Sequence, residues 1–534
     1  MVATTQPMAV AAGLEILGQG GNAADAAIAT AAALNVTEPT STGIGGDAFA
    51  LYYEAGSGQV TALNASGRAP ATLTIDRVKK AGLFTDPLLP IADPYHPYTI
   101  TVPGACSAWC AMVERHGRLQ LSDVLAPAIR LANEGFPVAP NTAYFWGRGA
   151  ERQLAKALNG HELTIDGRGP QAGEIFRNPG LARTFRKVAQ GGKDAFYQGE
   201  IAEAIVNVIS EAGGCMTLED LANHQATWDE PISTTYRGYR VWECPPNGQG
   251  LTALLGLNIL EGFNIAPLDP LLAVRLHLQI EALRLAFADT RWYVADPTFS
   301  NIPILELLSK SYAAERRKLI DPTKATINQQ RGTPAASSDT VYLTVVDGEG
   351  NACSFINSNY MGFGTGIVPK GWGFALQNRG HNFSLDPTHP NALAPGKRPY
   401  HTIIPGMITK DIQKSSVDRH QLFASFGVMG GFMQPQGHLQ VASALIDDQA
   451  DPQSALDRPR FIIKGGEASG GIGLEEGIPQ DVIAQLGKMG HTVEEISDFG
   501  RAIFGRGQVI LRDPESRVLW GGSDPRADGC AMSL

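Results

Sequence analysis

The sequence predicts an α+β globular fold, with a mostly helical first part and a strand-rich second part. Across residues 1–330, apolar side chains recur at helical spacing, and the longest such run is 273–294. From about residue 340 onward, short runs rich in β-branched residues predominate. Between these parts, "RGTPAASSD" at 331–339 is polar and contains Pro and Gly, which is typical of an exposed linker. The length of the chain predicts roughly two to four domains.

The first part is expected to begin with helices and one strand. A helix is predicted from about Pro7, and "NAADAAIATAAALNV" at 22–36 predicts a small-residue helix suited to close packing. "GIGGDAFALYY" at 43–53 predicts a glycine-rich turn that runs into a strand. Farther along, "LSDVLAPAIRLANEG" at 121–135 predicts a helix with Ser122 as its N-cap and a glycine at its C-terminal end.

The second part is expected to consist of strands with two helices among them. Its first two strands form a hairpin around a turn at 347–351. The predicted strands are 341–346, 352–357, 373–377, 403–409, 422–427, 508–512 and 517–520. The predicted helices are about 436–448 and 479–489.

Composition and charge exclude several classes of protein. The chain is 43% hydrophobic and 18% charged, which is typical of a soluble globular protein. Its formal net charge of −10 argues against nucleic acid or an anionic membrane as the main partner. No run of apolar residues is long enough for a membrane span. The N-terminus lacks a basic region and Glu15 interrupts its apolar stretch, so it is a poor signal peptide and we expect a cytoplasmic protein.

The sequence contains no pattern of a metal or nucleotide site. Six cysteines in 534 residues are too sparse for a disulfide scaffold, and Cys106 and Cys110 lack two further ligands at matching spacing. The 11 histidines form no HExxH motif, and neither a GxGxxG after a strand nor a P-loop is present. We therefore expect no metal and no cofactor.

Thr340 stands where the predicted linker meets the predicted hairpin. An N-terminal threonine is a complete small catalytic unit, because its hydroxyl is the nucleophile and its own α-amine is the base. An internal threonine gains that amine only after the bond before it breaks, here between Asp339 and Thr340. Its hydroxyl can make that cut by attacking the preceding carbonyl, and water completes the cleavage. The alternative is that Thr340 is simply the first residue of a strand, where threonine is common.

A second feature of this chemistry is a pair of glycines in "SFGVMGGFMQPQGHLQV" at 425–441. Gly430 and Gly431 follow a predicted strand and precede a predicted helix. Consecutive glycines let backbone N–H groups approach a substrate closely, as an oxyanion hole requires. The alternative is a simple tight turn.

Taken together, these motifs resemble the γ-glutamyltransferase family of N-terminal-nucleophile (Ntn) hydrolases over nearly the whole chain. The matching blocks occur in family order. They are "GGNAADAAIA" (20–29), "GIGGDAFALYY" (43–53), "PISTTYRGYRVWECPPNGQG" (231–250), "EALRLAFADTRWYVADPTF" (281–299), "TVYLTVVDGEGNACSF" (340–355), "FGTGIV" (363–368), "PGKRPYHTIIP" (395–405), "MGGFMQPQGHLQV" (429–441) and "GGSDPRADG" (521–529).

The resemblance implies an αββα four-layer sandwich that cleaves itself into a large subunit, 1–339, and a small subunit, 340–534, within one intertwined fold. It implies that Thr340 is nucleophile and base, that Ser358 hydrogen-bonds it, and that Gly430 and Gly431 form the oxyanion hole. The expected partners are a small-molecule amide and the two subunits themselves. A homodimer of such heterodimers is left open.

The sequence departs from the family where γ-glutamyl enzymes hold the substrate's α-carboxylate and α-amine. Ser66 falls at the place of the family's arginine, with Arg68 displaced by two, and Asn382 replaces its aspartate. The family's serine pair becomes His401 and Thr402. Each lost charge-assisted contact should cost about 1.5–3 kcal/mol of binding. A glutamate zwitterion is therefore not the expected ligand.

These departures are similar to a divergent branch that includes oxamate amidohydrolase and cephalosporin-acylase-like members. An oxamate-like amide has one carboxylate beside the scissile bond and no α-amine, and Arg68 or Arg379 could hold that carboxylate. The alternatives are that each arginine is structural, or that Arg68 and other side chains restore the binding of glutamate. Tyr360, which replaces a family asparagine, and His381 are expected near the pocket.

Three functions stay open at this point. The first is an amidohydrolase acting on a small carboxylate-bearing amide such as oxamate, and a glutaryl or cephalosporin-type acylase is kept as an alternative to it. The second is a γ-glutamyl hydrolase or transferase acting on glutathione. The third is an inactive binding homologue on the same fold, which the retained Thr340, Gly430 and Gly431 disfavour.

Overall fold

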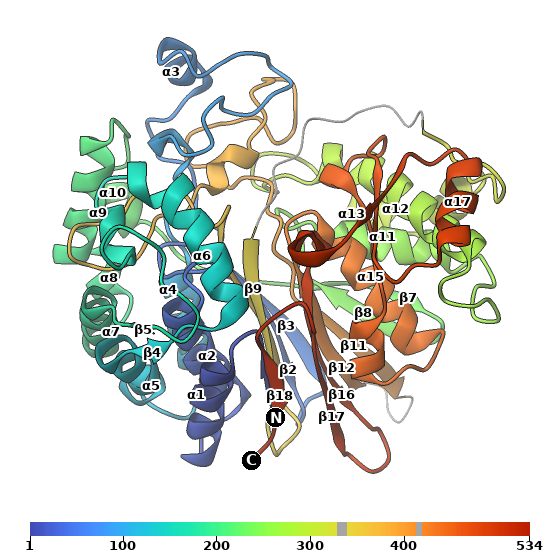
Figure 1. The fold of residues 1–534 in the computed structure, drawn as a ribbon, viewed down its shortest axis with the longest axis horizontal. Helices are drawn as coiled ribbons and strands as arrows, with labels where there is room; N and C mark the ends of the chain where they lie inside the picture. Colours follow the sequence, from blue (N-terminus) through green and yellow to red (C-terminus); the bar gives the residue numbers. More distant parts are fainter. Residues whose placement is uncertain (328–338, 413–418) are drawn as a thin grey trace.

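Two antiparallel sheets lie face to face between two layers of helices in the computed structural model, which describes residues 1–327, 339–412 and 419–534 (Figure 1). Within those residues the first sheet has seven strands. In spatial order they are β18 (Cys530–Met532), β1 (Val2–Thr4), β9 (Asp339–Val346), β10 (Ala352–Tyr360), β2 (Asp47–Glu54), β3 (Gln59–Asn64) and β6 (Thr227–Asp229).

The second sheet has six strands within the same residues. In spatial order they are β17 (Leu519–Ser523), β16 (Arg506–Arg512), β12 (Arg419–Met429), β11 (Gly406–Ile412), β8 (Tyr239–Glu243) and β7 (Ile232–Tyr236). The facing surfaces of the two sheets form one apolar core, which includes Phe49, Tyr342 and Met407. The sheets also make polar contact, since Thr344 Oγ1 donates to Ser425 Oγ at 2.6 Å. This is the stacked-sheet arrangement that the resemblance implies.

Helices cover the outer face of each sheet (Figure 1). The first sheet is covered by a layer that includes α1 (Pro7–Gly18), α2 (Ala23–Thr37), α4 (Ala105–His116), α5 (Leu121–Glu134) and α7 (Pro179–Gly191). The second is covered by a layer that includes α11 (Gly250–Leu260), α12 (Ala273–Tyr293), α15 (Met433–Ile446) and α17 (Gln480–Lys488). Of the described helices, none is long and apolar enough to cross a membrane.

The remaining α-helices and strands of the described residues lie around these four layers. The helices are α3 (Ile75–Lys80), α6 (Pro140–Arg152), α8 (Asp194–Tyr197), α9 (Glu200–Glu211), α10 (Leu218–Ala222), α13 (Ile304–Leu307), α14 (Lys310–Arg317) and α16 (Pro452–Asp457). The strands are β4 (Phe136–Pro137) and β5 (Ile175–Phe176), which pair, and β13 (Phe461–Ile463), β14 (Ile472–Glu475) and β15 (Val493–Ile496), which form a small third sheet.

Most predicted elements are found near their predicted positions. The longest predicted helix is α12, and the predicted hairpin is β9 with β10. The helix at 121–135 is α5, but its N-cap is Gln120 rather than Ser122, because the helix starts two residues earlier. The strand predicted at 373–377 is absent from the described residues. Gly371 and Gly373 have φ of 79° and 69° there, and such backbone does not continue a strand.

The two sheets join the two parts of the sequence. Strand β1, from the N-terminus, lies between β18 and β9, and the Met1 amine donates to the Val346 carbonyl at 2.8 Å. Six strands of the first part belong to these sheets, so that part is less helical than its sequence suggests. Both sheets mix strands of both parts, so the expectation of two to four separate domains is wrong. The predicted linker lies outside the described residues except for Asp339.

Candidate active site

Thr340 is fully buried near the start of β9, in the interior of the first sheet. Its hydroxyl Oγ1 donates to Ser358 Oγ on the neighbouring strand β10 at 3.2 Å. The pairing of β9 with β10 shifts register between Asn357 and Tyr360, which is the stretch that contains Ser358. Such an irregularity redirects side chains at the end of a ladder. The structure therefore brings the predicted nucleophile and its predicted partner into contact.

Gln434 also reaches Thr340, although sequence reasoning did not single it out. Its Nε2 donates to Thr340 Oγ1 at 3.5 Å, and its Oε1 accepts from the Ile404 amide at 2.8 Å. Gln434 lies in the first turn of α15, directly after the glycine pair. The sequence signal was its position three residues after Gly431 in "MGGFMQPQG".

Ser358 is held by two further donors. The Tyr360 amide donates to Ser358 Oγ at 2.9 Å, and Arg379 Nη2 donates to it at 3.1 Å. Arg379 Nη1 donates to Thr402 Oγ1 at 2.6 Å, and the guanidinium lies 4.5 Å from the centre of the Tyr360 ring. Three residues predicted to bind substrate, Tyr360, Arg379 and Thr402, are thus gathered around Ser358.

Arg379 is completely buried beneath this group of hydroxyls. Burial lowers the pKa of its guanidinium to about 10, while the charges of Asp47 and Tyr360 oppose the shift. A pKa of about 10 leaves Arg379 protonated at neutral pH. Its two Nη atoms are occupied by Ser358 and Thr402. The structure therefore places Arg379 as a buried cation that holds hydroxyls, and not on the cavity wall.

Asp47 lies on β2 directly opposite Ser358 in the sheet and forms a buried pair with His401. Asp47 Oδ2 lies 2.9 Å from His401 Nε2. Burial raises the pKa of Asp47 to about 6. Burial, with the charges of Arg379 and Arg398, holds the pKa of His401 well below its usual range. Sequence reasoning missed Asp47, although its place in a glycine-rich turn before a buried strand was a usable signal.

The glycine pair forms a tight turn between β12 and α15. Gly430 has φ of 130° and Gly431 has φ of 58°, values that L-residues with a Cβ rarely adopt. A Cβ on Gly430 would lie 3.1 Å from Gly505 Cα. The Gln434 amide donates to the Gly431 carbonyl at 3.2 Å, and the same residue contacts Thr340 through its side chain. The turn predicted to hold the oxyanion thus lies beside the predicted nucleophile.

Gln249, which precedes α11, joins this turn to the rest of the site. Its Nε2 donates to the carbonyls of Thr402 at 2.6 Å and Gly431 at 2.8 Å. Its Oε1 accepts from the Tyr400 hydroxyl at 3.0 Å. One buried amide from the first part of the chain therefore joins two segments of the second part, 400–402 and the glycine turn, around the site.

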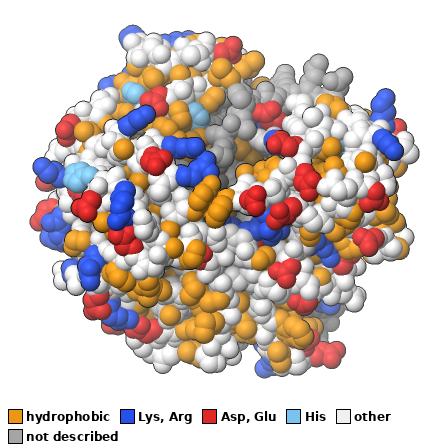
Figure 2. All heavy atoms as spheres, viewed as in Figure 1, with side chains coloured by type: hydrophobic (Ala, Val, Ile, Leu, Met, Phe, Trp, Pro, Cys, Tyr) orange, Lys and Arg blue, Asp and Glu red, His pale blue; other side chains and the backbone are white. Residues whose placement is uncertain are grey.

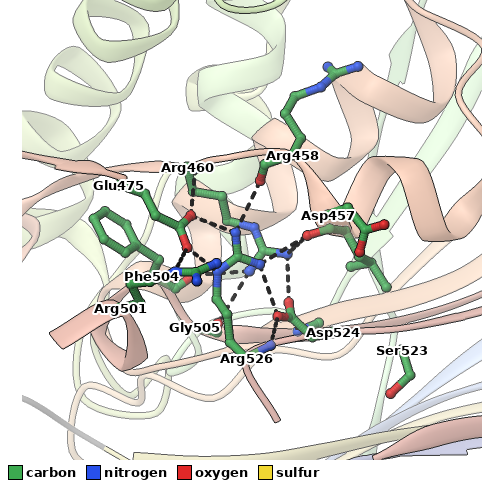
Figure 3. Close-up of polar contacts among 12 residues, drawn as sticks. Asp457, Arg458, Arg460, Glu475, Arg501, Phe504, Gly505, Ser523, Asp524 and Arg526 are labelled. Carbon is green, nitrogen blue, oxygen red and sulfur yellow. Dashed lines mark hydrogen bonds and ion pairs between the residues drawn. The ribbon is translucent and has the colours of Figure 1, made fainter. Parts of the chain in front are cut away.

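A network of buried charges surrounds Phe504 and Gly505 (Figure 3). Arg460 donates through Nη1 to the carbonyls of Phe504 at 3.0 Å and Gly505 at 3.3 Å, and it pairs with Asp524 at 2.7 Å. Arg526, from the block "GGSDPRADG", pairs with Asp524 at 2.9 Å and with Glu475 at 2.5 Å. The turn at 504–505, which contacts the glycine turn, is therefore fixed by paired buried charges.

A cavity of about 430 Å³ lies next to Tyr360 and the glycine turn. Its wall includes Tyr360, Asn382 and Tyr400, and also Phe432, which directly follows the glycine pair. The Tyr360 hydroxyl donates to Asn382 Oδ1 at 2.5 Å, and Asn382 Nδ2 donates to the Tyr400 carbonyl at 3.1 Å. Asn382 thus lines the cavity, with its polar atoms bonded within the protein. His381 also lines it, and burial lowers its pKa to about 4.

Arg68 is placed apart from this group. Its Nη1 lies 3.2 Å from Asp296 Oδ2 and donates to the Gly396 carbonyl at 3.0 Å, and Arg68 is not among the residues that line the cavity. Ser66 is fully buried, and its hydroxyl accepts from Asn247 Nδ2 at 2.9 Å. The structure therefore does not bring Arg68 together with the other predicted substrate-binding residues.

The described residues contain one group with the ligand chemistry for a metal ion, His277, Glu281 and His491. None of the three lines the cavity. His277 Nδ1 lies 2.8 Å from His491 Nε2, and His277 Nε2 lies 2.8 Å from the Asp321 carbonyl.

The face shown in Figure 2 carries Lys, Arg, Asp and Glu side chains interspersed with one another.

Comparison with known proteins identifies the family. The model of the family "Gamma-glutamyltranspeptidase" matches residues 9–534. The chain belongs to this family. It is 36% identical over 540 residues to the "Glutathione hydrolase-like YwrD proenzyme" of Bacillus subtilis (strain 168), covering 100% of this chain and 98% of that protein. It is 33% identical to the "Oxamate amidohydrolase proenzyme" of Klebsiella pneumoniae, covering 99% and 98% of the two chains.

Solved structures agree with this membership. The crystal structure of a cephalosporin acylase from Bacillus halodurans is 47% identical, with a TM-score of 0.91, and covers 100% of this chain and 95% of that one. The γ-glutamyltranspeptidase family consists of Ntn amide hydrolases. The predicted family, the αββα fold class and the assignment as an Ntn amidohydrolase are thereby confirmed.

Proposed function

We propose that this chain cleaves itself before Thr340 and then uses Thr340 to hydrolyse an amide whose acyl group carries a free carboxylate and no α-ammonium. The single observation that carries the proposal is the contact between Thr340 Oγ1 and Ser358 Oγ at the start of a buried strand. The proposed products of maturation are a large subunit, 1–339, and a small subunit, 340–534. Several relatives bear the word "proenzyme" in their names, which supports maturation by cleavage.

The proposed reaction uses Thr340 and the backbone of the glycine turn beside it. After cleavage, the α-amine of Thr340 takes the hydroxyl proton, and Oγ1 attacks the substrate carbonyl. Backbone N–H groups of Gly430 and Gly431 stabilise the oxyanion. The C–N bond breaks, the amine leaves with the proton, and the acyl group stays on Thr340 as an ester. Water activated by the same α-amine then releases the carboxylic acid and restores the hydroxyl.

The proposed substrate class is supported by side chains that are hydrogen-bonded within the protein where γ-glutamyl enzymes bind their substrate. Asn382 is neutral, and its side chain is used by Tyr360 and the Tyr400 carbonyl, so it offers no charge to an α-ammonium. Ser66 is bonded to Asn247. His401 and Thr402, at the place of the family's serine pair, are bonded to Asp47 and Arg379. A γ-glutamyl zwitterion would thus lack its partners at both ends.

Two candidate substrates remain within this class, and relatives carry both names. One relative is an oxamate amidohydrolase, and the 47% identical structure is a cephalosporin acylase. Hydrolysis of glutathione is the second candidate function, favoured by the 36% identity to a glutathione hydrolase-like protein. The proposal expects little turnover of glutathione and little transfer to dipeptide acceptors.

A panel of amides distinguishes these functions. The matured protein is given oxamate, succinamate, glutaramate, glutathione and γ-glutamyl-p-nitroanilide at equal concentration, and product release is measured. We expect kcat/KM to be at least about tenfold higher for one of the three monoamides than for either γ-glutamyl compound, as one lost charge-assisted contact implies. A preference for the γ-glutamyl compounds would replace this proposal with the second function.

A further inference from the structure

The cavity that Tyr360 and Phe432 line contains a cation that the predicted site did not include. Arg291 lies in the last turn of α12 and lines the cavity together with Tyr360, Asn382 and Tyr400. Its guanidinium carbon lies 4.4 Å from the centre of the Phe432 ring and 5.4 Å from that of Tyr400. These rings hold the guanidinium by cation–π contact. Phe432 directly follows the glycine pair, so Arg291 is tied to the segment that carries the predicted oxyanion hole.

The charge of Arg291 is not paired within the described part of the chain. Among residues 1–327, 339–412 and 419–534, no carboxylate lies within ion-pair distance of it, whereas Arg68 and Arg316 pair with Asp296 and Asp289. The charge of Arg291 acts on Glu467, which does not line the cavity, and the carboxylate that does line the cavity is that of Asp386. The charge of Arg291 is also felt at Tyr360, whose pKa burial raises to about 12 while Arg379 and Arg291 oppose that shift.

We propose that Arg291 is the specificity-determining residue that binds the free carboxylate of the acyl group; this inference rests on the proposed function. A guanidinium presents a planar fork of donors that matches a carboxylate, and an arginine already stacked on aromatic rings loses little freedom on binding. The assignment replaces Arg68, which is paired with Asp296 outside the cavity, and Arg379, whose Nη atoms are bonded to Ser358 and Thr402.

The cavity also limits the shape of the acyl group. Its volume of about 430 Å³ lies within the range of roughly 300–1,000 Å³ typical of sites for drug-sized ligands. Aromatic side chains form much of its wall, including Trp292, Phe383, Tyr400 and Phe432. A two-carbon oxalyl group would leave most of this apolar surface uncovered. We therefore expect an apolar linker between the scissile carbonyl and the distal carboxylate, as in glutaryl or longer dicarboxylic amides.

The test compares a substrate that carries a free carboxylate with its uncharged methyl ester. Glutaryl-p-nitroanilide and its methyl ester differ only in the distal charge, and release of p-nitroaniline reports both. For matured wild type we expect kcat/KM to be about 10- to 100-fold higher for the acid, mainly through KM. In Arg291→Met this ratio should fall to within about threefold of one. Arg291→Lys, which keeps the charge, should retain part of the preference.

The matched control is Arg115→Met. Arg115 also lies 4.4 Å from an aromatic ring, that of Trp228, but does not line the cavity, so this variant should keep the wild-type ratio. A wild type without any preference for the acid would overturn the proposed function and this inference together. A preference that survives in Arg291→Met, or that is lost in Arg68→Met instead, would overturn this inference alone. If Arg291→Met does not mature, Arg291→Gln takes its place with the same expected ratio.

Discussion

Thr340 Oγ1 lies 3.2 Å from Ser358 Oγ, across the two strands of one hairpin. Ser358 is in turn held by the Tyr360 amide and by Arg379. The hydroxyl that the proposed mechanism uses is therefore oriented by a group whose own position is fixed by a backbone donor and a buried cation. The contact depends on the sheet register at the end of β10, and not on a flexible loop.

Replacing Ser358 should slow the reaction without unfolding the protein. In Ser358→Ala, Thr340 loses its acceptor and Arg379 loses one of its two bonded hydroxyls, so we expect kcat to fall by about 10- to 100-fold, in line with one positioned hydrogen bond. Ser354→Ala is the control, because Ser354 is buried on the same strand but lies 2.7 Å from the Tyr342 hydroxyl instead. Equal kcat in both variants, measured on matured protein, would remove Ser358 from the mechanism.

A side chain on Gly430 should damage the oxyanion site. Gly430→Val places a Cβ 3.1 Å from Gly505 Cα in a backbone conformation with φ of 130°. We expect turnover to fall on the order of 10²-fold or more, comparable with the loss of one oxyanion donor. Gly20→Val is the control for backbone strain alone, since Gly20 has φ of 92° with no atom within 4 Å of its Cβ position. Near-normal kcat in Gly430→Val would place the oxyanion donors elsewhere.

Asp47 should make the folded state less stable as pH rises. Burial raises its pKa from 3.8 to about 6, so the folded protein binds a proton that the unfolded chain has already released. The stability contributed by that proton is fully present below the unfolded pKa and is lost as pH rises through about 6. Between pH 4 and 7, the unfolding free energy of wild type minus that of Asp47→Asn should therefore decrease, by up to about 3 kcal/mol. Chemical unfolding at a series of pH values measures it, and a constant difference would contradict the assignment.

Arg460 should matter for stability far more than its neighbour Arg458. In Arg460→Met, Asp524 loses a buried partner and the carbonyls of Phe504 and Gly505 lose their donor. We expect a loss of about 3–5 kcal/mol in unfolding free energy. Arg458→Met breaks a more exposed pair with Asp448, which should cost less than about 1 kcal/mol. Similar losses in the two variants would show that the network of Figure 3 does not hold the turn.

Local signals predicted most of the elements, and long-range contacts account for what was missed. Periodicity located α12 and the β9–β10 hairpin, because those patterns act within one element. The interleaving of both parts in each sheet could not be read from the sequence, since pairing Val2 with Val345 depends on distant segments. Thr340, Ser358 and the glycine pair were predicted because they follow the order of family motifs.

The rest of the site was harder to predict for the same reason. His401 and Asp47 are separated by 354 positions, and no local pattern links them. Arg68 and Arg291 show that the sequence did not indicate which arginine lines the cavity. Arg68 was chosen because it lies two residues from the family's arginine position, but the fold pairs it with Asp296. Arg291 lies in a helical segment whose sequence gave no indication of function, and in the structure it lines the cavity.

The most direct test of the account is the mass and N-terminal sequence of the purified protein. The account predicts two fragments that stay together under native conditions, and the smaller should begin Thr340-Val341-Tyr342-Leu343. Thr340→Ala should remain one chain of 534 residues and be inactive. A wild-type protein that remains uncut yet hydrolyses amides, or a small fragment that begins at another residue, would contradict the central claim that Thr340 becomes an N-terminal nucleophile.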